Sequence, residues 1–143
     1  MKVATVDIGT NSMRLLIADY EDNEIFNRKK YVEVTRINKG VDEKEMISGE
    51  AINFNTDILD KFINIVQSKN CEKIRVIGTS ALRDSKNSDE FIKKAYEKTG
   101  INIEIIRGRR HETRRGERTL AKRACRRHYQ TSHYHRRSTH LNH

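Results

Sequence analysis

The 143-residue sequence contains no proline, no tryptophan and only two cysteines. Two cysteines do not form a disulfide framework, so we expect Cys71 and Cys125 to be free and inert thiols. No apolar run approaches the length that spans a bilayer, and the N-terminus enters a strand pattern without separate charged and apolar signal regions. The sequence therefore predicts a cytoplasmic protein that has no membrane partner.

Charge is distributed unevenly along the chain. Residues 1–106 hold 17 Lys and Arg against 18 Asp and Glu, whereas residues 107–143 hold 12 against 2. The second part also holds all six histidines and lacks Ile, Val, Phe and Met entirely. Low hydrophobicity with high net charge is typical of a disordered segment. We therefore expect one ordered domain over residues 1–108 and a disordered Arg/His-rich tail over residues 109–143.

A tight polar turn joins two apolar strands near the N-terminus. Asp7 stands near the end of the first strand, and the connection that follows is Gly9, Thr10, Asn11 and Ser12. Successive backbone N–H groups in such a turn can hold anionic oxygens. A carboxylate beside a bound phosphate is tolerable mainly when a hard cation such as Mg²⁺ bridges the two. The pattern favours a metal-assisted phosphate site, with a plain hairpin turn as the alternative.

A second segment repeats the pattern of a buried strand followed by Gly-Thr-Ser. Residues 74–84 read Ile-Arg-Val-Ile-Gly-Thr-Ser-Ala-Leu-Arg-Asp, with Arg83 as the charged group. Two such junctions in one short chain, one with a carboxylate and one with a guanidinium, are difficult to explain by turn chemistry alone. The repeat therefore favours the phosphate site.

Hydrophobic periodicity predicts an α/β fold with a mixed five-stranded sheet. The expected strands cover residues 2–8, 13–20, 24–34, 73–78 and 102–106. The first three would form an antiparallel meander, and each later strand would return through a helix that packs on the sheet. Ligands of such sheets lie at strand ends, where the turns after Ile8 and at Gly78 fall.

Two helices are expected between these strands. The longer helix has Ser48 as its N-cap. Its apolar face is expected to contain Ile52, Leu59, Phe62, Ile63 and Val66, with Asn55 placed mostly outside that face. The shorter covers about residues 89–99, with Asn87 or Ser88 as cap and Gly100 at its end. We interpret its apolar stripe as core, with Phe91, Ile92, Ala95 and Tyr96 as members.

These motifs resemble the exopolyphosphatase and guanosine pentaphosphate phosphohydrolase family (Ppx/GppA), in the superfamily of actin, sugar kinases and heat-shock chaperones. The resemblance rests on Asp7-Ile8-Gly9-Thr10-Asn11-Ser12, Arg14-Leu15-Leu16 and Thr79-Ser80-Ala81-Leu82-Arg83-Asp84, with Thr35-Arg36-Ile37 and Gly40-Val41-Asp42 between them. It covers residues 2–108. It implies a ribonuclease-H-like (actin-like ATPase) N-terminal lobe, and 143 residues are too few for two full lobes of that fold.

The resemblance also implies a function, the hydrolysis of terminal phosphoanhydrides of polyphosphate or guanosine pentaphosphate with Mg²⁺ as cofactor. Asp7 would hold the metal, Gly9, Thr10, Asn11 and Ser12 would cradle phosphate, and Arg83 would act as the catalytic residue that neutralises charge. The family's general base is a glutamate after the last strand, where this chain has Arg109 and Arg110. Glu112 is out of register, and the opposing lobe is missing. We therefore expect the chain alone to be weak or inactive.

Three interpretations of the tail remain open. It is a nucleic-acid-binding arm if its arginines track phosphates and Tyr129 and Tyr134 stack on bases. It is a metal site if ligand-type side chains converge, although their spacing fits no zinc template: Cys125, His128, His133, His135, His140 and His143. The favoured interpretation is an out-of-frame segment, because codons for the family's glutamate run, read one base out of frame, encode consecutive arginines.

Two other functions compete with the hydrolase lobe. One is a non-enzymatic phosphate- or nucleic-acid-binding module, in which nucleic acid binds only through the tail. The other is a nucleotide-dependent actin-like or chaperone protein, which the segment 79–83 argues against because that motif is characteristic of the hydrolases. The sequence does not choose between polyphosphate and guanosine pentaphosphate, and a homodimer is compatible with it.

Overall fold

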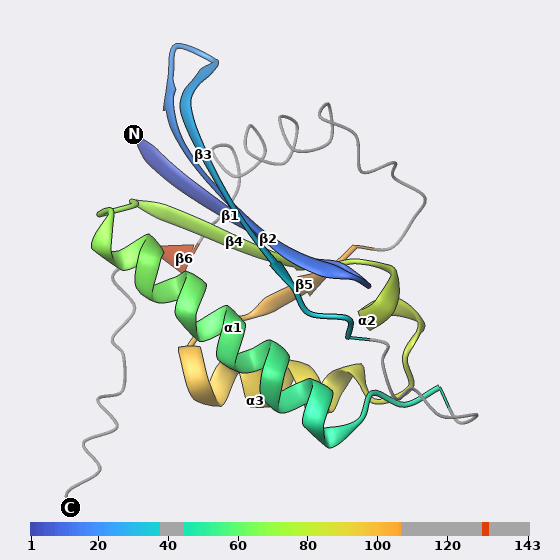
Figure 1. Cartoon of the computed structure of the whole chain (residues 1–143). Coiled ribbons are helices and arrows are strands. Elements are labelled where there is room, and N and C mark those ends of the chain that lie inside the picture. The colour runs from blue at the N-terminus through green and yellow to red at the C-terminus, as the bar shows by residue number, and fades with distance from the viewer. Residues whose placement is uncertain (38–44, 107–129, 132–143) are drawn as a thin grey trace, which may run out of the picture.

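A mixed sheet is the centre of the structure, a computed structural model that describes residues 1–37, 45–106 and 130–131 (Figure 1). Its strand order is β3-β2-β1-β4-β5, with a two-residue β6 also paired to β4. The strands are β1 (Lys2–Ile8), β2 (Ser12–Glu21), β3 (Glu24–Val34), β4 (Lys73–Gly78), β5 (Ile103–Ile105) and β6 (Gln130–Thr131). The five-stranded mixed sheet expected from the sequence is therefore confirmed.

Strand pairing brings two distant strand ends together. The first three strands form an antiparallel meander, and β1 also pairs in parallel with β4. In that parallel register Ile8 lies opposite Gly78. The segments that follow these two residues, 9–12 and 79–84, therefore leave the sheet at the same edge.

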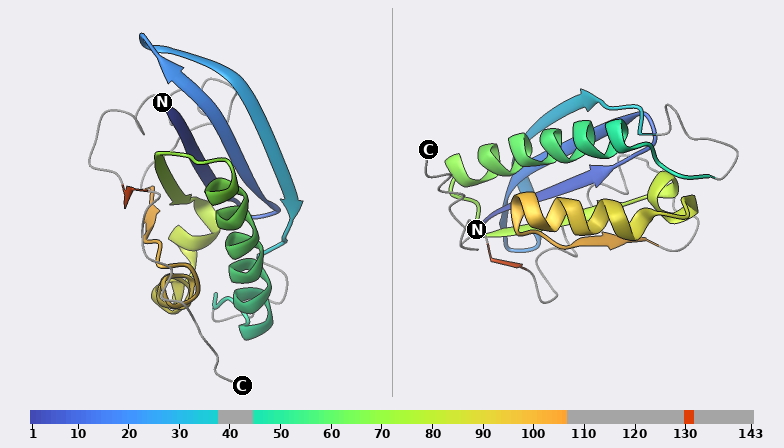
Figure 2. Two further views of the ribbon diagram at one scale, coloured as in Figure 1. Left: turned by 90° about the vertical axis from the view of Figure 1, so that its left-hand side faces the viewer. Right: turned by 90° about the horizontal axis from the view of Figure 1, so that it is seen from below.

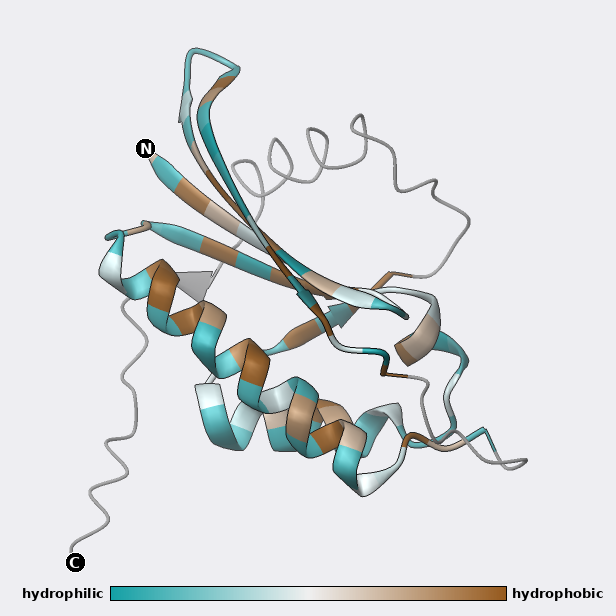
Figure 3. Cartoon of the chain, in the orientation of Figure 1, coloured by the Kyte–Doolittle hydropathy of each residue, from teal (hydrophilic) through white to brown (hydrophobic). Residues whose placement is uncertain are grey.

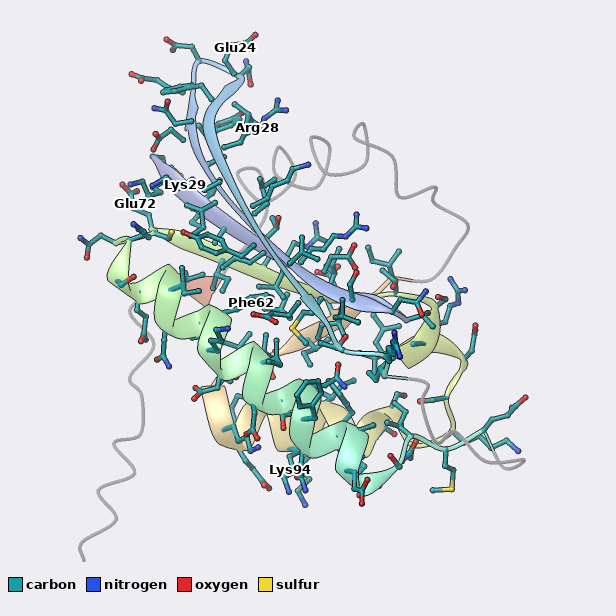
Figure 4. All side chains as sticks on the ribbon, viewed as in Figure 1. Glu24, Arg28, Lys29, Phe62, Glu72 and Lys94 are labelled. Carbon is teal, nitrogen blue, oxygen red and sulfur yellow. The ribbon has the colours of Figure 1, made fainter. Side chains whose placement is uncertain are left out.

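Helices α1 (Gly49–Ser68) and α3 (Ser88–Thr99) pack against each other on one face of the sheet (Figure 2). The core between them contains alternate residues of β1 and β2, among them Val6, Ile8 and Leu15, together with Phe62 of α1. Figure 3 shows apolar residues on the side of α1 that faces the sheet, and Figure 4 shows Phe62 between α1 and the strands. Burial of this apolar stripe stabilises each helix.

The ends of both helices agree with the sequence prediction. The Ser48 side chain accepts a hydrogen bond from the amide of Ala51 at 3.1 Å, as an N-cap should. Asn87 occupies the N-cap position of α3, and Gly100 closes that helix at a φ of 72°. Glycine adopts this left-handed conformation at a helix C-terminus without strain.

Two predictions about the buried faces are wrong. Asn55 is fully buried rather than off the apolar face, and its Nδ2 donates to the carbonyl of Ala51 at 2.9 Å. Tyr96 is 52% exposed, because the buried stripe of α3 runs through Phe91, Ala95 and Thr99 at a spacing of four residues. The Thr99 hydroxyl bonds to the carbonyl of Ala95 at 2.7 Å, which allows a polar side chain on that stripe.

Three further details differ from the sequence prediction. β2 is one residue longer at each end than predicted, and β5 covers three residues instead of five. A short helix, α2 (Ser80–Asp84), begins directly after the second Gly-Thr junction, where we expected only a turn. Within the described residues, no helix is long and apolar enough to cross a membrane.

Candidate phosphate-binding site

The second Gly-Thr-Ser segment is bonded to the end of β1. Both the amide and the hydroxyl of Thr79 donate to the carbonyl of Ile8, at 3.2 and 3.1 Å. The same hydroxyl makes no capping bond to α2, although Thr79 is the N-cap residue of that helix. The two segments with similar sequences are therefore joined directly.

A hydroxyl pair extends this junction into the first turn. The Oγ1 of Thr10 lies 3.1 Å from the Oγ of Ser80, and either atom can be the donor. The two residues are 70 positions apart in the chain and their contact is partly buried. Tertiary structure therefore unites the two motifs that the sequence shows separately.

The turn over residues 9–12 has a defined backbone geometry. The Gly9 amide donates to the Ser12 carbonyl at 3.0 Å, and a Cβ on Gly9 would lie 2.9 Å from that oxygen. The carbonyls of Thr10 and Asn11 accept bonds from the amides of residues 35–37. Within the described residues, the amides of Thr10 and Asn11 donate to no backbone carbonyl. These two amides are therefore the turn's available anion donors, whereas the Gly9 amide is already engaged.

A pocket of about 240 Å³ opens beside the hydroxyl pair. Its described lining residues include three hydroxyls and two carboxylates over an apolar floor: Thr10, Ile37, Glu45, Ile47, Ser80, Ala81, Asp84 and Ser85. The Oγ of Ser85 is buried and makes no hydrogen bond within the described residues. The pocket thus offers hydroxyl donors and carboxylate acceptors next to the turn.

Asp7 lies on the other face of the sheet. It stands opposite Arg14 of β2, and the two residues line a small cavity of about 30 Å³ together with Lys30 and others. Because strand residues alternate between faces, Asp7 points away from the face covered by α1 and α3, to which Val6 and Ile8 belong. The structure therefore places Asp7 near the turn but outside the pocket that Thr10 lines.

Arg83 projects from α2. Its Nε donates to Oδ1 of the neighbouring Asp84 at 3.1 Å, and the two side chains are 36% and 68% exposed. Exposed ion pairs of this kind contribute little to stability, so the guanidinium can change partners when an anion binds. Arg83 is three positions after Ser80 on the same helix and so lies on the same side of it.

Three residues near the turn were not among the predicted site residues. Ser80 stands in the segment that repeats the strand and Gly-Thr pattern of the first turn, so the repeat itself could have identified it. Asp84 ends the motif over residues 79–84 but was given no role, whereas Glu45 carries no local signal, because only the fold brings it to the pocket. No group of three or more His, Cys, Asp or Glu suited to a metal ion occurs among the described residues. Arg109, Arg110, Glu112 and the proposed tail ligands lie outside them.

The fold is a ribonuclease-H-like lobe in which the two turns are joined at one edge of the sheet. A sequence model of the Ppx/GppA phosphatase family matches residues 5–127. The chain therefore belongs to the Ppx/GppA phosphatase family.

Relatives with known names support this assignment. The chain is 40% identical over 112 residues to a bifunctional 3-dehydroquinate synthase/phosphatase of Fusobacterium nucleatum, covering 73% of the chain and 17% of that protein. It is 34% identical over 105 residues to a guanosine-5'-triphosphate,3'-diphosphate pyrophosphatase of Vibrio vulnificus, covering 73% and 21%. The chain spans about a fifth of these curated relatives.

Solved structures agree with the fold. The Ppx/GppA family member of Aquifex aeolicus is 26% identical and superposes with a TM-score of 0.69, over 74% of this chain and 35% of that one. An exopolyphosphatase from Cytophaga hutchinsonii is 28% identical with a TM-score of 0.65, over 74% and 34%. The described chain thus corresponds to about a third of these structures.

Proposed function

We propose that this chain is the N-terminal lobe of an enzyme that hydrolyses terminal phosphoanhydride bonds of polyphosphate or guanosine pentaphosphate. The observation that carries the proposal is the bond between Thr10 and Ser80, which joins the Gly-Thr-Asn-Ser turn to the Gly-Thr-Ser segment at one sheet edge. Family membership supports the reaction class. The opposing lobe lies outside this chain, which covers only 35% of the Aquifex aeolicus structure.

One carboxylate at this edge, that of Asp7, has the chemistry to hold a magnesium ion, although no group of three or more acidic, His or Cys side chains surrounds it among the described residues. Asp7 supplies carboxylate oxygens, which Mg²⁺ prefers, and its Oδ1 is buried. Glu45 and Asp84 line the separate pocket beside Thr10, which Asp7 does not line, so they are not assigned to the same ion. When bound, the metal would neutralise phosphate charge and so allow a carboxylate to stand beside an anionic substrate. Of these residues, we propose Asp7 as the metal-holding one.

The chain's own groups would bind and orient the phosphate. The amides of Thr10 and Asn11 would donate to its oxygens, and the hydrogen bond from the Gly9 amide to the Ser12 carbonyl would keep the turn in that conformation. The Arg83 guanidinium would neutralise charge on the transferring group. The glutamate base of the family falls at Arg109 and Arg110, so proton abstraction from water is the step we expect this chain to lack.

Binding and turnover by the full chain test the proposal. We expect the chain to bind tripolyphosphate with Mg²⁺ in calorimetry, and to release little phosphate from long-chain polyphosphate. A positioned base contributes about 10²–10⁴-fold to such a rate, and closure by a second lobe adds exclusion of water. Because tripolyphosphate is a polyanion, the titration is repeated at several salt concentrations.

Two results would count against the proposal. Binding that is unaffected by Asp7→Ala and Arg83→Ala, but falls steeply with salt, would show nonspecific attraction to the basic tail. Rapid turnover by the chain as it stands would show that its base is present, and Glu112 would then be the first residue to mutate. Changing Arg109 and Arg110 to Glu without an opposing lobe should not restore activity.

The cytoplasmic location stays a prediction from the sequence.

A further inference from the structure

Ser80 reaches the phosphate-binding turn from a distant part of the chain. We infer that Ser80 is a positioning residue, whose hydrogen bond to Thr10 holds the turn and Arg83 in a fixed relation for one phosphate group. This inference rests on the proposed function, because it concerns the same site. The inference gives Ser80 a role that is separate from holding the metal and from the backbone bonds within the turn.

The two hydroxyls of the second segment have separate partners. Thr79 bonds to the Ile8 carbonyl, at the end of β1, whereas Ser80 bonds to Thr10 within the turn. Thr79 therefore fixes the strand end, and Ser80 is the residue that contacts the turn. Because each hydroxyl has a single O–H, the Thr10–Ser80 pair uses one in their mutual bond and leaves one to donate to a phosphate oxygen.

The short helix α2 is packed against the sheet, so that the position of Ser80 also determines the position of Arg83. Leu82 is fully buried, and a Cβ on Gly78 would lie 2.5 Å from its Cδ1, so the helix packs directly on the end of β4. Ser80 and Arg83 are three positions apart and share one side of α2. A bond at Ser80 therefore fixes the backbone from which the Arg83 guanidinium extends.

Calorimetry with magnesium tripolyphosphate tests the inference on the full chain. We expect Ser80→Ala to weaken binding about five-fold, the usual effect of losing one neutral hydrogen bond. Ser80→Thr keeps the hydroxyl and should bind within about two-fold of the wild type. Ser68→Ala is the matched control, because it also removes one serine hydroxyl bond, to the Ile65 carbonyl at 2.7 Å, but far from the turn.

A double-mutant cycle separates positioning from simple loss of structure. If Ser80 acts by placing Arg83, Ser80→Ala should have less than about a two-fold effect once Arg83→Ala is present. An equal effect in both backgrounds would overturn the inference, as would failure of Ser80→Thr to restore binding. Thermal unfolding of each variant shows whether the fold is retained.

A measurement without ligand keeps the inference distinct from the proposed function. If the wild-type chain does not bind tripolyphosphate, the proposed function fails, and hydrogen exchange at the Gly9 amide still tests the role of Ser80. That amide donates to the Ser12 carbonyl inside the turn. Ser80→Ala should speed its exchange and Ser68→Ala should not. Unchanged exchange in Ser80→Ala would then overturn the inference.

Discussion

Asn87 pairs with the backbone of Ile47 through both atoms of its side-chain amide. Its Oδ1 accepts the Ile47 amide at 2.7 Å and its Nδ2 donates to the Ile47 carbonyl at 2.9 Å. The neighbouring Lys86 amide donates to the carbonyl of Glu45 at 3.0 Å. The residue at the start of α3 thus holds the segment that forms one wall of the pocket beside the turn.

Asn87→Ala should lower the free energy of unfolding by about 2–3 kcal/mol. The change leaves a buried amide and a buried carbonyl of Ile47 without partners, and each unsatisfied buried group costs about 1–3 kcal/mol. Urea denaturation followed by circular dichroism measures the loss. Asn64→Ala is the control, because Asn64 is an exposed asparagine of α1. A loss no larger than in that control would show that the Asn87 bonds do not stabilise the fold.

Gly9→Ala should disrupt the turn, whereas Gly49→Ala should not. An added Cβ at Gly9 would meet the Ser12 carbonyl oxygen at 2.9 Å, while at Gly49 it would meet nothing within 4 Å. We expect Gly9→Ala to weaken binding of magnesium tripolyphosphate about ten-fold or more, since displaced amides lose their alignment with the anion. Calorimetry on both variants decides this. Equal binding by the two would mean that the turn does not hold the phosphate.

Asp7→Ala should weaken binding of the magnesium complex while leaving the fold intact. Loss of one contact to a charged group is worth about 1.5–3 kcal/mol. The effect should nearly vanish when tripolyphosphate is titrated without Mg²⁺, because there is then no metal ion for the carboxylate to hold. Unfolding of the variant at 25 °C, with no separate effect on binding, would show that Asp7 is structural.

Arg83→Ala should weaken binding by a similar amount with or without Mg²⁺, because the guanidinium acts on the anion directly. Its ion pair with Asp84 is exposed, so the loss of that pair should hardly change the unfolding temperature. Lys94→Ala is the matched control, since Figure 4 shows Lys94 on α3, away from the turn. A comparable loss of binding in both variants would indicate a general effect of charge.

Stability should fall above pH 9 because of Cys71. Burial raises the pKa of its thiol from 9.0 to about 11. Between these values the unfolded chain releases the proton and the folded chain keeps it, so stability decreases as pH rises, by roughly 2 kcal/mol across the window. Urea denaturation at pH 8 and pH 11 measures the decrease. Cys71→Ala should lose less stability than the wild type between these two pH values. An equal loss would show that other groups cause the effect.

The sequence alone determined the elements of the lobe. Short segments rich in apolar and β-branched residues, bounded by turn residues, identified β1, β3 and β4 with their observed ends, because both signals are local in the sequence. Ser48 and Gly100 marked helix ends for a similarly local reason, since capping depends on a residue and its near neighbours. The motifs over residues 7–16 and 79–84 also indicated the family, which the comparisons confirmed.

Only the tertiary structure decided how the site is assembled. The parallel pairing of β1 with β4 brings Thr10 within 3.1 Å of Ser80, a contact between residues 70 positions apart. Asp7 and the pocket lie on different sides of the sheet. Residues of β1 alternate between its two faces, and only folding decides which face the helices cover. The burial of Asn55 and the exposure of Tyr96 likewise depend on which side of each helix meets its neighbour, since packing between α1 and α3 sets that side.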